Sequence, residues 1–129
     1  MPKILVIDDS GFLRQYVRGI LEEAGHVVED FLPFSVLEVL EKCRTFMPDL
    51  VMTDYNMPHV DGLAVVRMLR RHSPTLPVVL FTATRDPERT AKLKAYMPVW
   101  ILYKPLAGPQ LLVELNRILM PGATPPPIG

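Results

Sequence analysis

Residues 3–10 read KILVIDDS, a run of four aliphatic residues that ends in two aspartates and a serine. A short apolar run of this kind is typical of a strand that is buried on both faces. Similar runs follow at Leu50 to Thr53 and at Val78 to Thr82, and two weaker runs occupy His26 to Phe31 and Val99 to Tyr103. The stretches between the runs read as helices. This alternation of strand and helix predicts an α/β fold with a doubly wound parallel sheet.

Apolar stripes and capping residues mark the expected helices. Leucine, valine and isoleucine recur at helical spacing between Leu13 and Ala24 and between Leu111 and Leu119. Gly25 is placed to end the first helix, and Asp86-Pro87 to begin the fourth. The fourth helix, from Glu88 to Lys94, is only weakly amphipathic, so we expect it to pack shallowly.

The length and composition predict one domain. The chain has 129 residues, of which 49% are hydrophobic, and this is enough for a single packed core. We expect the domain to span residues 1–120. Residues 121–129 contain four prolines and little apolar surface, which predicts a Pro-rich disordered tail or a truncated linker.

The charge balance and the apolar runs exclude some classes of function. Fourteen basic and fourteen acidic residues give a net charge of zero, without the basic excess typical of direct nucleic-acid binding. No apolar run approaches the roughly 18 residues of a membrane span, and the N-terminus does not read as a signal peptide. We therefore expect a cytoplasmic protein without membrane contact. Cys43 is the one cysteine and lies at helical spacing from Val39 and Val36, which favours a packing role.

Polar residues follow four of the expected strands. Asp8 and Asp9 follow the first, Asp54 the third and Lys104 the fifth, while Thr82 ends the fourth. Because ligands of such sheets bind at the carboxyl ends of the strands, these residues should form one site. Three close carboxylates repel one another unless a cation neutralises them, and oxygen-only ligands favour Mg²⁺, which recruits phosphate oxygens. A carboxylate can then accept a phosphoryl group while the lysine and the hydroxyl stabilise its charge.

The complete set of motifs resembles the response-regulator receiver family of two-component signalling, including its single-domain chemotaxis-type members. The resemblance runs from Lys3 to about Met120 and rests on Asp8-Asp9, Asp54, Asn56-Met57-Pro58, Asp61-Gly62, Thr82-Ala83 and Lys104-Pro105. It implies a flavodoxin-like fold with a five-stranded parallel sheet of order 2-1-3-4-5 flanked by five helices.

The resemblance also assigns roles to the candidate residues. It implies that Asp54 is phosphorylated, that Asp9, Asp54 and the backbone carbonyl of Asn56 ligate Mg²⁺, and that Asp8 holds a metal-bound water. Lys104 is expected to grip the phosphoryl group, and Thr82 to move toward it after transfer. The peptide bond between Lys104 and Pro105 is expected to be cis.

Partners follow from the same resemblance. It implies a sensor histidine kinase or a phosphotransfer protein as the phosphodonor, and an effector protein or effector domain that meets the surface of helix four, strand five and helix five. A homodimer formed on phosphorylation stays open. The protein is expected to catalyse its own phosphorylation and dephosphorylation without turning over an external substrate, so it is not an enzyme in the usual sense.

The sequence departs from the family pattern in two places. Ile101 stands where most relatives carry Tyr or Phe, and strand alternation makes Tyr103, not Trp100, the better substitute for that aromatic residue. Tyr96-Met97-Pro98 replaces a common Gly-Ala turn, which indicates an unusual path for this loop. Arg67, Arg70 and Arg71 read as the solvated face of the third helix.

Three alternative functions are weighed against the receiver. Haloacid-dehalogenase-type phosphatases need an acidic residue two positions after the nucleophile, and neither Asp54 nor Asp8 has one. A flavodoxin-like FMN site would bring a phosphate against Asp8 and Asp9, which repel it. A phosphorylation-independent interaction module with a degenerate switch would typically have lost the acceptor aspartate or the lysine, and both are present.

Overall fold

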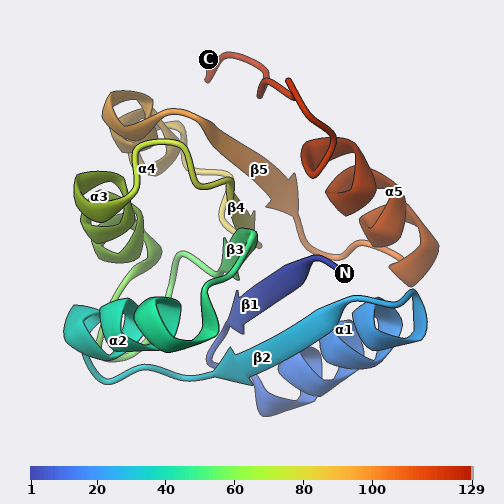
Figure 1. Ribbon diagram of the computed structural model, residues 1–129. Helices are drawn as coiled ribbons and strands as arrows, with labels where there is room; N and C mark the ends of the chain where they lie inside the picture. The colour runs from blue at the N-terminus through green and yellow to red at the C-terminus, as the bar shows by residue number, and fades with distance from the viewer. Residues whose placement is uncertain (129) are drawn as a thin grey trace.

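The computed structural model describes residues 1–128 and has the expected α/β architecture. The elements in chain order are β1 (Lys3–Ile7), α1 (Gly11–Glu23), β2 (Val27–Phe31), α2 (Val36–Phe46), β3 (Leu50–Thr53), α3 (Gly62–His72), β4 (Val78–Thr82), α4 (Pro87–Ala91), the 3-10 helix η1 (Lys92–Tyr96), β5 (Val99–Tyr103) and α5 (Gly108–Ile118). All four strand pairs are parallel, and the sheet order is β2-β1-β3-β4-β5, which confirms the prediction (Figure 1).

Helices cover both faces of the sheet. Figure 1 shows α1 and α5 on one side and α2, α3 and α4 on the other. Alternate residues of a strand point to opposite faces, so β1 sends Leu5 and Ile7 into the α2–α3 cluster and Ile4 and Val6 into the α1–α5 cluster. All four side chains are almost completely buried, which explains why this strand reads as a continuous apolar run.

Local capping fixes where the helices begin and end. The Ser10 hydroxyl accepts a hydrogen bond from the Leu13 N–H at 3.1 Å and thereby starts α1 directly after the two aspartates. Gly25 adopts a φ of 95° beyond the end of α1, a conformation that glycine adopts without the steric cost a Cβ imposes. Asp61 and Asp86 cap α3 and α4, and the Asp86 cap confirms the predicted start of the fourth helix.

Helix four is shorter than predicted. The sequence predicts one helix from Glu88 to Lys94, whereas the structure has five residues of α4 followed by the 3-10 helix η1. None of the α4 side chains is buried, and Leu93 is the buried residue of η1. A segment with so little apolar contact lacks the tertiary packing that stabilises short helices.

The loop between η1 and β5 takes the unusual path that its sequence indicates. Arg70 of α3 donates hydrogen bonds to the backbone carbonyls of Tyr96 and Pro98, the first at 2.7 Å. The prediction that Arg70 lies on a solvated face is therefore wrong, because its guanidinium group supplies donors to a loop whose carbonyls lack strand partners.

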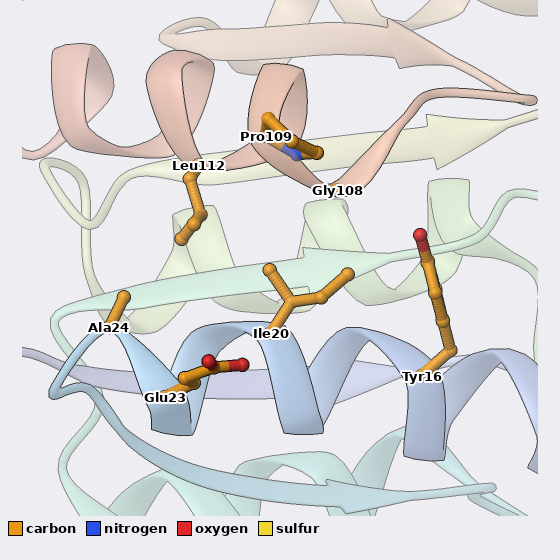
Figure 2. A pocket seen from close by; sticks show the side chains of 7 residues that line it. All are labelled: Tyr16, Ile20, Glu23, Ala24, Gly108, Pro109 and Leu112. Carbon is orange, nitrogen blue, oxygen red and sulfur yellow. The ribbon is translucent and has the colours of Figure 1, made fainter.

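A hollow of about 420 Å³ lies between α1 and α5 (Figure 2). Tyr16 and Ile20 project into it from α1, and Gly108, Pro109 and Leu112 line it from α5. A Cβ on Gly108 would lie 2.7 Å from the Ile20 side chain, so glycine lets the two helices approach closely here. The hollow is lined mainly by apolar groups, and none of the predicted site residues lines it.

Residues 121–128 form no helix or strand, as their prolines dictate. Ala123 and Ile128 are partly buried against the two core clusters. Among residues 1–128, no helix combines the length and apolar character needed to cross a bilayer.

Candidate functional site

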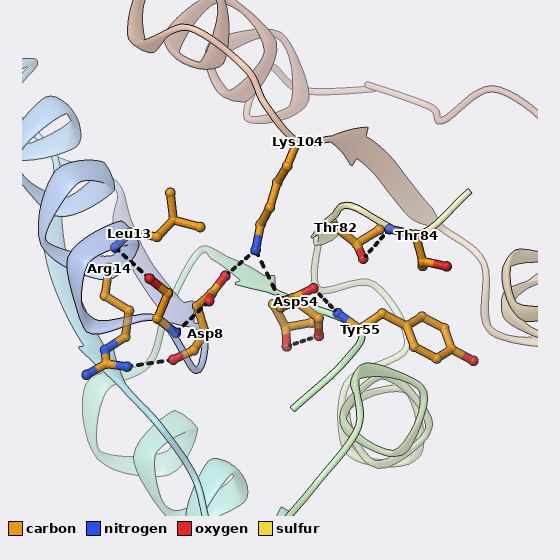
Figure 3. Close-up of polar contacts among 10 residues, drawn as sticks. Asp8, Leu13, Arg14, Asp54, Tyr55, Thr82, Thr84 and Lys104 are labelled. Carbon is orange, nitrogen blue, oxygen red and sulfur yellow. Dashed lines mark hydrogen bonds and ion pairs between the residues drawn. The ribbon is translucent and has the colours of Figure 1, made fainter. Parts of the chain in front are cut away.

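The predicted site residues meet at one edge of the sheet, at the carboxyl ends of the strands. Asp8 follows β1, Asp54 follows β3, Thr82 ends β4 and Lys104 follows β5. Figure 3 shows Lys104 reaching between Asp8 and Asp54. Parallel strands all finish at the same edge, so the strand order alone gathers side chains that are up to 96 positions apart in the sequence.

Lys104 bridges two buried carboxylates. Its Nζ lies 2.8 Å from Oδ2 of Asp8 and 3.1 Å from Oδ2 of Asp54. The side chains of Lys104, Asp8 and Asp54 are 19%, 5% and 11% exposed, so the three charges interact through a medium less polar than water. The peptide bond between Lys104 and Pro105 is cis, as predicted.

Burial and charge act in opposite directions on these groups. Burial raises the pKa of Asp8, and the hydrogen bonds from Lys104 and from the Ser10 N–H offset only part of that rise. Burial by itself lowers the pKa of Lys104, but the hydrogen bonds and negative charges of Asp8 and Asp54 outweigh it and raise the pKa. Lys104 therefore stays protonated.

The backbone around Asp54 is held tightly. The Asp54 N–H donates to the carbonyl of Ile7 at 3.0 Å, and the Asp54 Oδ1 accepts from the Tyr55 N–H at 2.7 Å. Gly62, at the start of α3, donates its N–H to the Tyr55 carbonyl at 2.7 Å. A Cβ at position 62 would collide with the carbonyl oxygen of Asp54 and the Cα of Tyr55. Glycine at this position is therefore needed for the close approach of α3 to the backbone of Asp54 and Tyr55.

Three carboxylates can face a common metal ion. One carboxylate oxygen each from Asp8, Asp9 and Asp54 lies within 4.8 Å of the others. Asp8 and Asp54 are buried whereas Asp9 is exposed, so the group opens to solvent on one side. Three carboxylates against the single ammonium of Lys104 leave a formal charge of two negative, and this all-oxygen set suits a hard divalent cation.

Asn56 lies in the loop after β3, and its side chain contacts a residue of α4. Its Oδ1 accepts a hydrogen bond from the Arg89 guanidinium of α4, which also lies 5.7 Å from the centre of the Tyr55 ring. This contact directs the Asn56 side chain toward α4. Arg89 was not among the predicted site residues, because its sequence position is 33 residues away and carries no signal of this contact.

Thr82 is buried at the end of β4. Its Oγ1 accepts a hydrogen bond from the Thr84 N–H at 3.2 Å, and the hydroxyl proton is left for another acceptor. The Lys104 N–H donates to the Thr82 carbonyl at 2.9 Å, so the backbones that carry these two residues are directly joined. This hydrogen bond links the end of β4 to the residue that follows β5.

Arg14 is a second residue that sequence reasoning missed. Its guanidinium donates to the backbone carbonyl of Asp8 at 2.6 Å and pairs with Asp30 of β2 at 3.0 Å. Arg14 lies one helical turn after Ser10, and Asp30 lies late in β2. This spacing is the sequence signal that could have indicated the contacts of Arg14.

The model of the response regulator receiver domain family matches residues 4–116, which is most of the chain. The chain belongs to the response regulator receiver domain family. The match includes the whole edge of the sheet described above, from β1 to α5.

Curated relatives of this receiver domain are longer proteins. Response regulator MprA of Mycobacterium ulcerans is 37% identical over 123 residues, which cover 91% of this chain and 50% of the relative. A protein-glutamate methylesterase/protein-glutamine glutaminase of Carboxydothermus hydrogenoformans is 32% identical, over 64% of this chain and 23% of the relative. The chain thus spans about half of the first relative and about a quarter of the second.

Solved structures of similar length share the fold. The chemotaxis response regulator CheY4 of Vibrio cholerae is 32% identical with a TM-score of 0.82, and the alignment covers 92% of this chain and 98% of that one. The signal receiver domain of a signal transduction histidine kinase from Syntrophus aciditrophicus is 29% identical with a TM-score of 0.79, over 92% and 90% of the two chains. Receiver domains of this fold therefore occur both alone and as parts of larger signalling proteins.

Proposed function

We propose that this receiver domain accepts a phosphoryl group on Asp54 from a phosphohistidine of a sensor histidine kinase or phosphotransfer protein, in a Mg²⁺-dependent reaction. An oxygen of the Asp54 carboxylate attacks phosphorus, the bond from phosphorus to the donor nitrogen breaks, and the imidazole takes up a proton. The observation that carries the proposal is the position of Lys104 Nζ, within hydrogen-bond distance of both Asp8 and Asp54.

Lys104 and Thr82 have distinct roles in this proposal. After transfer, the new phosphoryl oxygens need donors, and the Lys104 ammonium is already at 3.1 Å from the acceptor carboxylate. The Thr82 hydroxyl supplies a further donor if β4 shifts toward the phosphoryl group. The shift of Thr82 then changes the backbone that joins β4 to β5 and so changes the surface of α4, β5 and α5.

The acidic group supplies the proposed metal site. Asp9, Asp54 and the backbone carbonyl of Asn56 are the proposed ligands of Mg²⁺, and Asp8 is proposed to hold a metal-bound water. When bound, Mg²⁺ would neutralise charge on the carboxylates and on the phosphate oxygens during transfer. The formal charge of two negative, the all-oxygen donors and the exposure of Asp9 support this choice of ion.

One exposed aromatic side chain lies beside the proposed site. Phe12 lies in the first turn of α1, four residues beyond Asp8, and is 86% exposed. An exposed aromatic side chain at this place offers an apolar contact to a donor protein. We expect Phe12→Ala to slow phosphotransfer from a protein donor and to leave labelling by acetyl phosphate unchanged.

The proposal also includes the effector, the location and the self-catalysed reactions of the protein. Downstream, the protein would act on an effector protein or effector domain, in the cytoplasm, without direct contact with nucleic acid or membrane. A homodimer formed on phosphorylation stays an open alternative for that output. The protein would catalyse its own phosphorylation and dephosphorylation without turning over an external substrate.

A phosphorylation-independent interaction module is the second candidate. Ile101 favours it, because the aromatic residue typical of this strand position is absent and the usual switch is therefore altered. The buried bridge of Lys104 to Asp54 favours the phosphoacceptor, because a buried charge cluster is costly to keep without a use for it.

The experiment that separates the two is intact mass spectrometry after incubation with acetyl phosphate, with and without Mg²⁺. The proposal expects a mass increase of one phosphoryl group that needs Mg²⁺ and disappears in Asp54→Asn. Asp61→Asn is the matched control, because Asn preserves the cap of α3 and leaves the site intact. Absence of the adduct in the wild type under all conditions would favour the interaction module.

A further inference from the structure

Residues 121–128 wrap around the outer edge of the sheet (Figure 1). Ala123 packs against the α1–α5 cluster, whereas Ile128 packs against the α2–α3 cluster on the opposite face. β5 is the edge strand between these two contacts, because β4 is its neighbour in the sheet order. The segment therefore passes from one face of the sheet to the other around β5.

On the α4 side, this segment closes a cavity of about 220 Å³. One wall of the cavity consists of Thr90 from α4 and of Val99, Ile101 and Tyr103 from β5. The opposite wall consists of the segment residues Pro126, Pro127 and Ile128. Alternate residues of β5 point to the same face, so these three β5 side chains form one continuous surface. The C-terminal segment lies opposite that surface, with Ile128 partly buried and Pro126 and Pro127 exposed.

The composition of the segment suits this contact. Pro125, Pro126 and Pro127 have a fixed φ, which limits the conformations that the free segment can adopt. Less conformational entropy is then lost when the segment lies against β5. Ile128 is partly buried and contributes an apolar side chain at the end of this stiff stretch.

The covered surface is joined directly to the phosphoacceptor site. Thr82 and Tyr103 are register partners in the β4–β5 ladder. Arg85, three residues beyond Thr82, places its guanidinium group 4.2 Å from the centre of the Tyr103 ring. A shift of Thr82 and of the loop that follows it therefore moves a wall of the cavity that holds the segment.

We propose that Pro126, Pro127 and Ile128 occupy a docking site on the face of β5 and exclude an external protein from it. We further propose that phosphorylation of Asp54 shifts Thr82 and Tyr103 and releases the segment. The occupation stands on the contacts above, whereas the release rests on the proposed function.

The test uses the chain of residues 1–129 and nuclear Overhauser effects between the Ile128 methyl groups and the side-chain protons of Val99, Ile101 and Tyr103, which line the same cavity. The proposal expects these effects in the unphosphorylated protein. Ile128→Asp should abolish the contact and shift the Tyr103 ring signals, because a charged side chain will not stay against the apolar β5 face. Thr124→Asp is the matched control, since Thr124 is exposed and outside the cavity, and it should leave the Tyr103 signals in place.

The release is tested by adding Mg²⁺ and beryllofluoride as a phosphoryl mimic, with fluorine signals of the bound mimic as a separate readout of the site. Loss of the effects between Ile128 and the β5 side chains on binding supports the release, and their persistence with the mimic bound overturns it. Absence of the effects in the unphosphorylated protein overturns the occupation itself. Failure of the mimic to bind would count against the proposed function and the release that rests on it, while the occupation is judged from the spectrum without the mimic.

Discussion

The Nζ of Lys104 lies 3.1 Å from Oδ2 of Asp54, in a pair where neither side chain is more than 19% exposed. The same ammonium also contacts Asp8, so one cation serves two buried carboxylates. A cation in this position offsets the repulsion between the two carboxylates, and under the proposed function it would also lie within reach of the phosphoryl oxygens. Removing the Lys104 ammonium therefore leaves both Asp8 and Asp54 without this cation.

Replacing Lys104 by methionine should make the protein depend more on Mg²⁺. Asp8 and Asp54 lose their shared partner, which should lower the free energy of unfolding by about 2 kcal/mol without metal, since leaving buried charge unpaired is costly. The acidic group then binds Mg²⁺ with less competing positive charge, so Mg²⁺ should raise the melting temperature more in Lys104→Met than in the wild type. Lys92→Met, at an exposed lysine, is the control. An equal rise in melting temperature on adding Mg²⁺ to Lys104→Met and to the wild type would contradict this role of Lys104.

Gly62→Ala should displace the backbone of Asp54 and Tyr55 and destabilise the protein. The added methyl group would meet the Asp54 carbonyl oxygen and the Tyr55 Cα, both of which are backbone atoms and cannot rotate away. We expect a lower melting temperature and slower labelling by acetyl phosphate. Gly19→Ala is the matched control, because a Cβ there meets nothing within 4 Å and replaces glycine inside α1. That change should stabilise the protein by roughly 0.4–1 kcal/mol, and similar stability of both variants would refute the proposed clash.

Arg89→Ala should shorten the lifetime of phosphorylated Asp54. Arg89 donates a hydrogen bond to the Asn56 side chain, and under the proposed function its loss would free Asn56 and leave the acyl phosphate more open to water. A decrease of up to about tenfold is expected, equivalent to roughly 1.4 kcal/mol in the barrier to hydrolysis. The decay of the phosphorylated mass with time measures it, with Arg71→Ala, at an exposed arginine of α3, for comparison. An unchanged or longer lifetime would exclude this shielding role.

Cys43 should react slowly with alkylating reagents in the folded protein. Burial raises the pKa of its thiol from 9.0 to about 11. At pH 8 the thiolate fraction, and with it the alkylation rate, should be about a hundredfold lower than in the unfolded chain. Because the folded pKa is the higher one, the thiol favours the folded state below pH 9 and loses this contribution as the pH rises through 11. Equal iodoacetamide rates in buffer and in urea would contradict the burial of this side chain.

The sheet and the core of the site could be predicted because each strand is a short, largely apolar run and the site residues lie at or just beyond the carboxyl ends of the strands. Asp8, Asp54 and Lys104 needed only the rule that parallel strands end at one edge. The contact of Arg89 with Asn56 and the anchoring of Pro98 by Arg70 could not be predicted in this way. Both use long side chains from helices to reach loops about 30 positions away, and no local pattern specifies such pairs.

The C-terminal segment shows the same limit of sequence patterns. Its prolines correctly exclude helix and strand, but they do not exclude packing by the one isoleucine that follows them. Similarly, the weak amphipathicity of residues 88–94 indicates a shallow helix without showing where it changes into η1. Single apolar contacts between distant segments decide both features, and these contacts depend on the assembled sheet.

The central claim is that Asp54, and no other side chain, carries the phosphoryl group. The most direct test is to label the wild type with acetyl phosphate and Mg²⁺, reduce it with borohydride and map the product by peptide mass spectrometry. Reduction of an aspartyl phosphate yields homoserine, so the account predicts homoserine at position 54 in the labelled protein and aspartate there when Mg²⁺ is omitted. Homoserine at position 8 or 9, or a phosphoryl group that remains on a histidine, would contradict it.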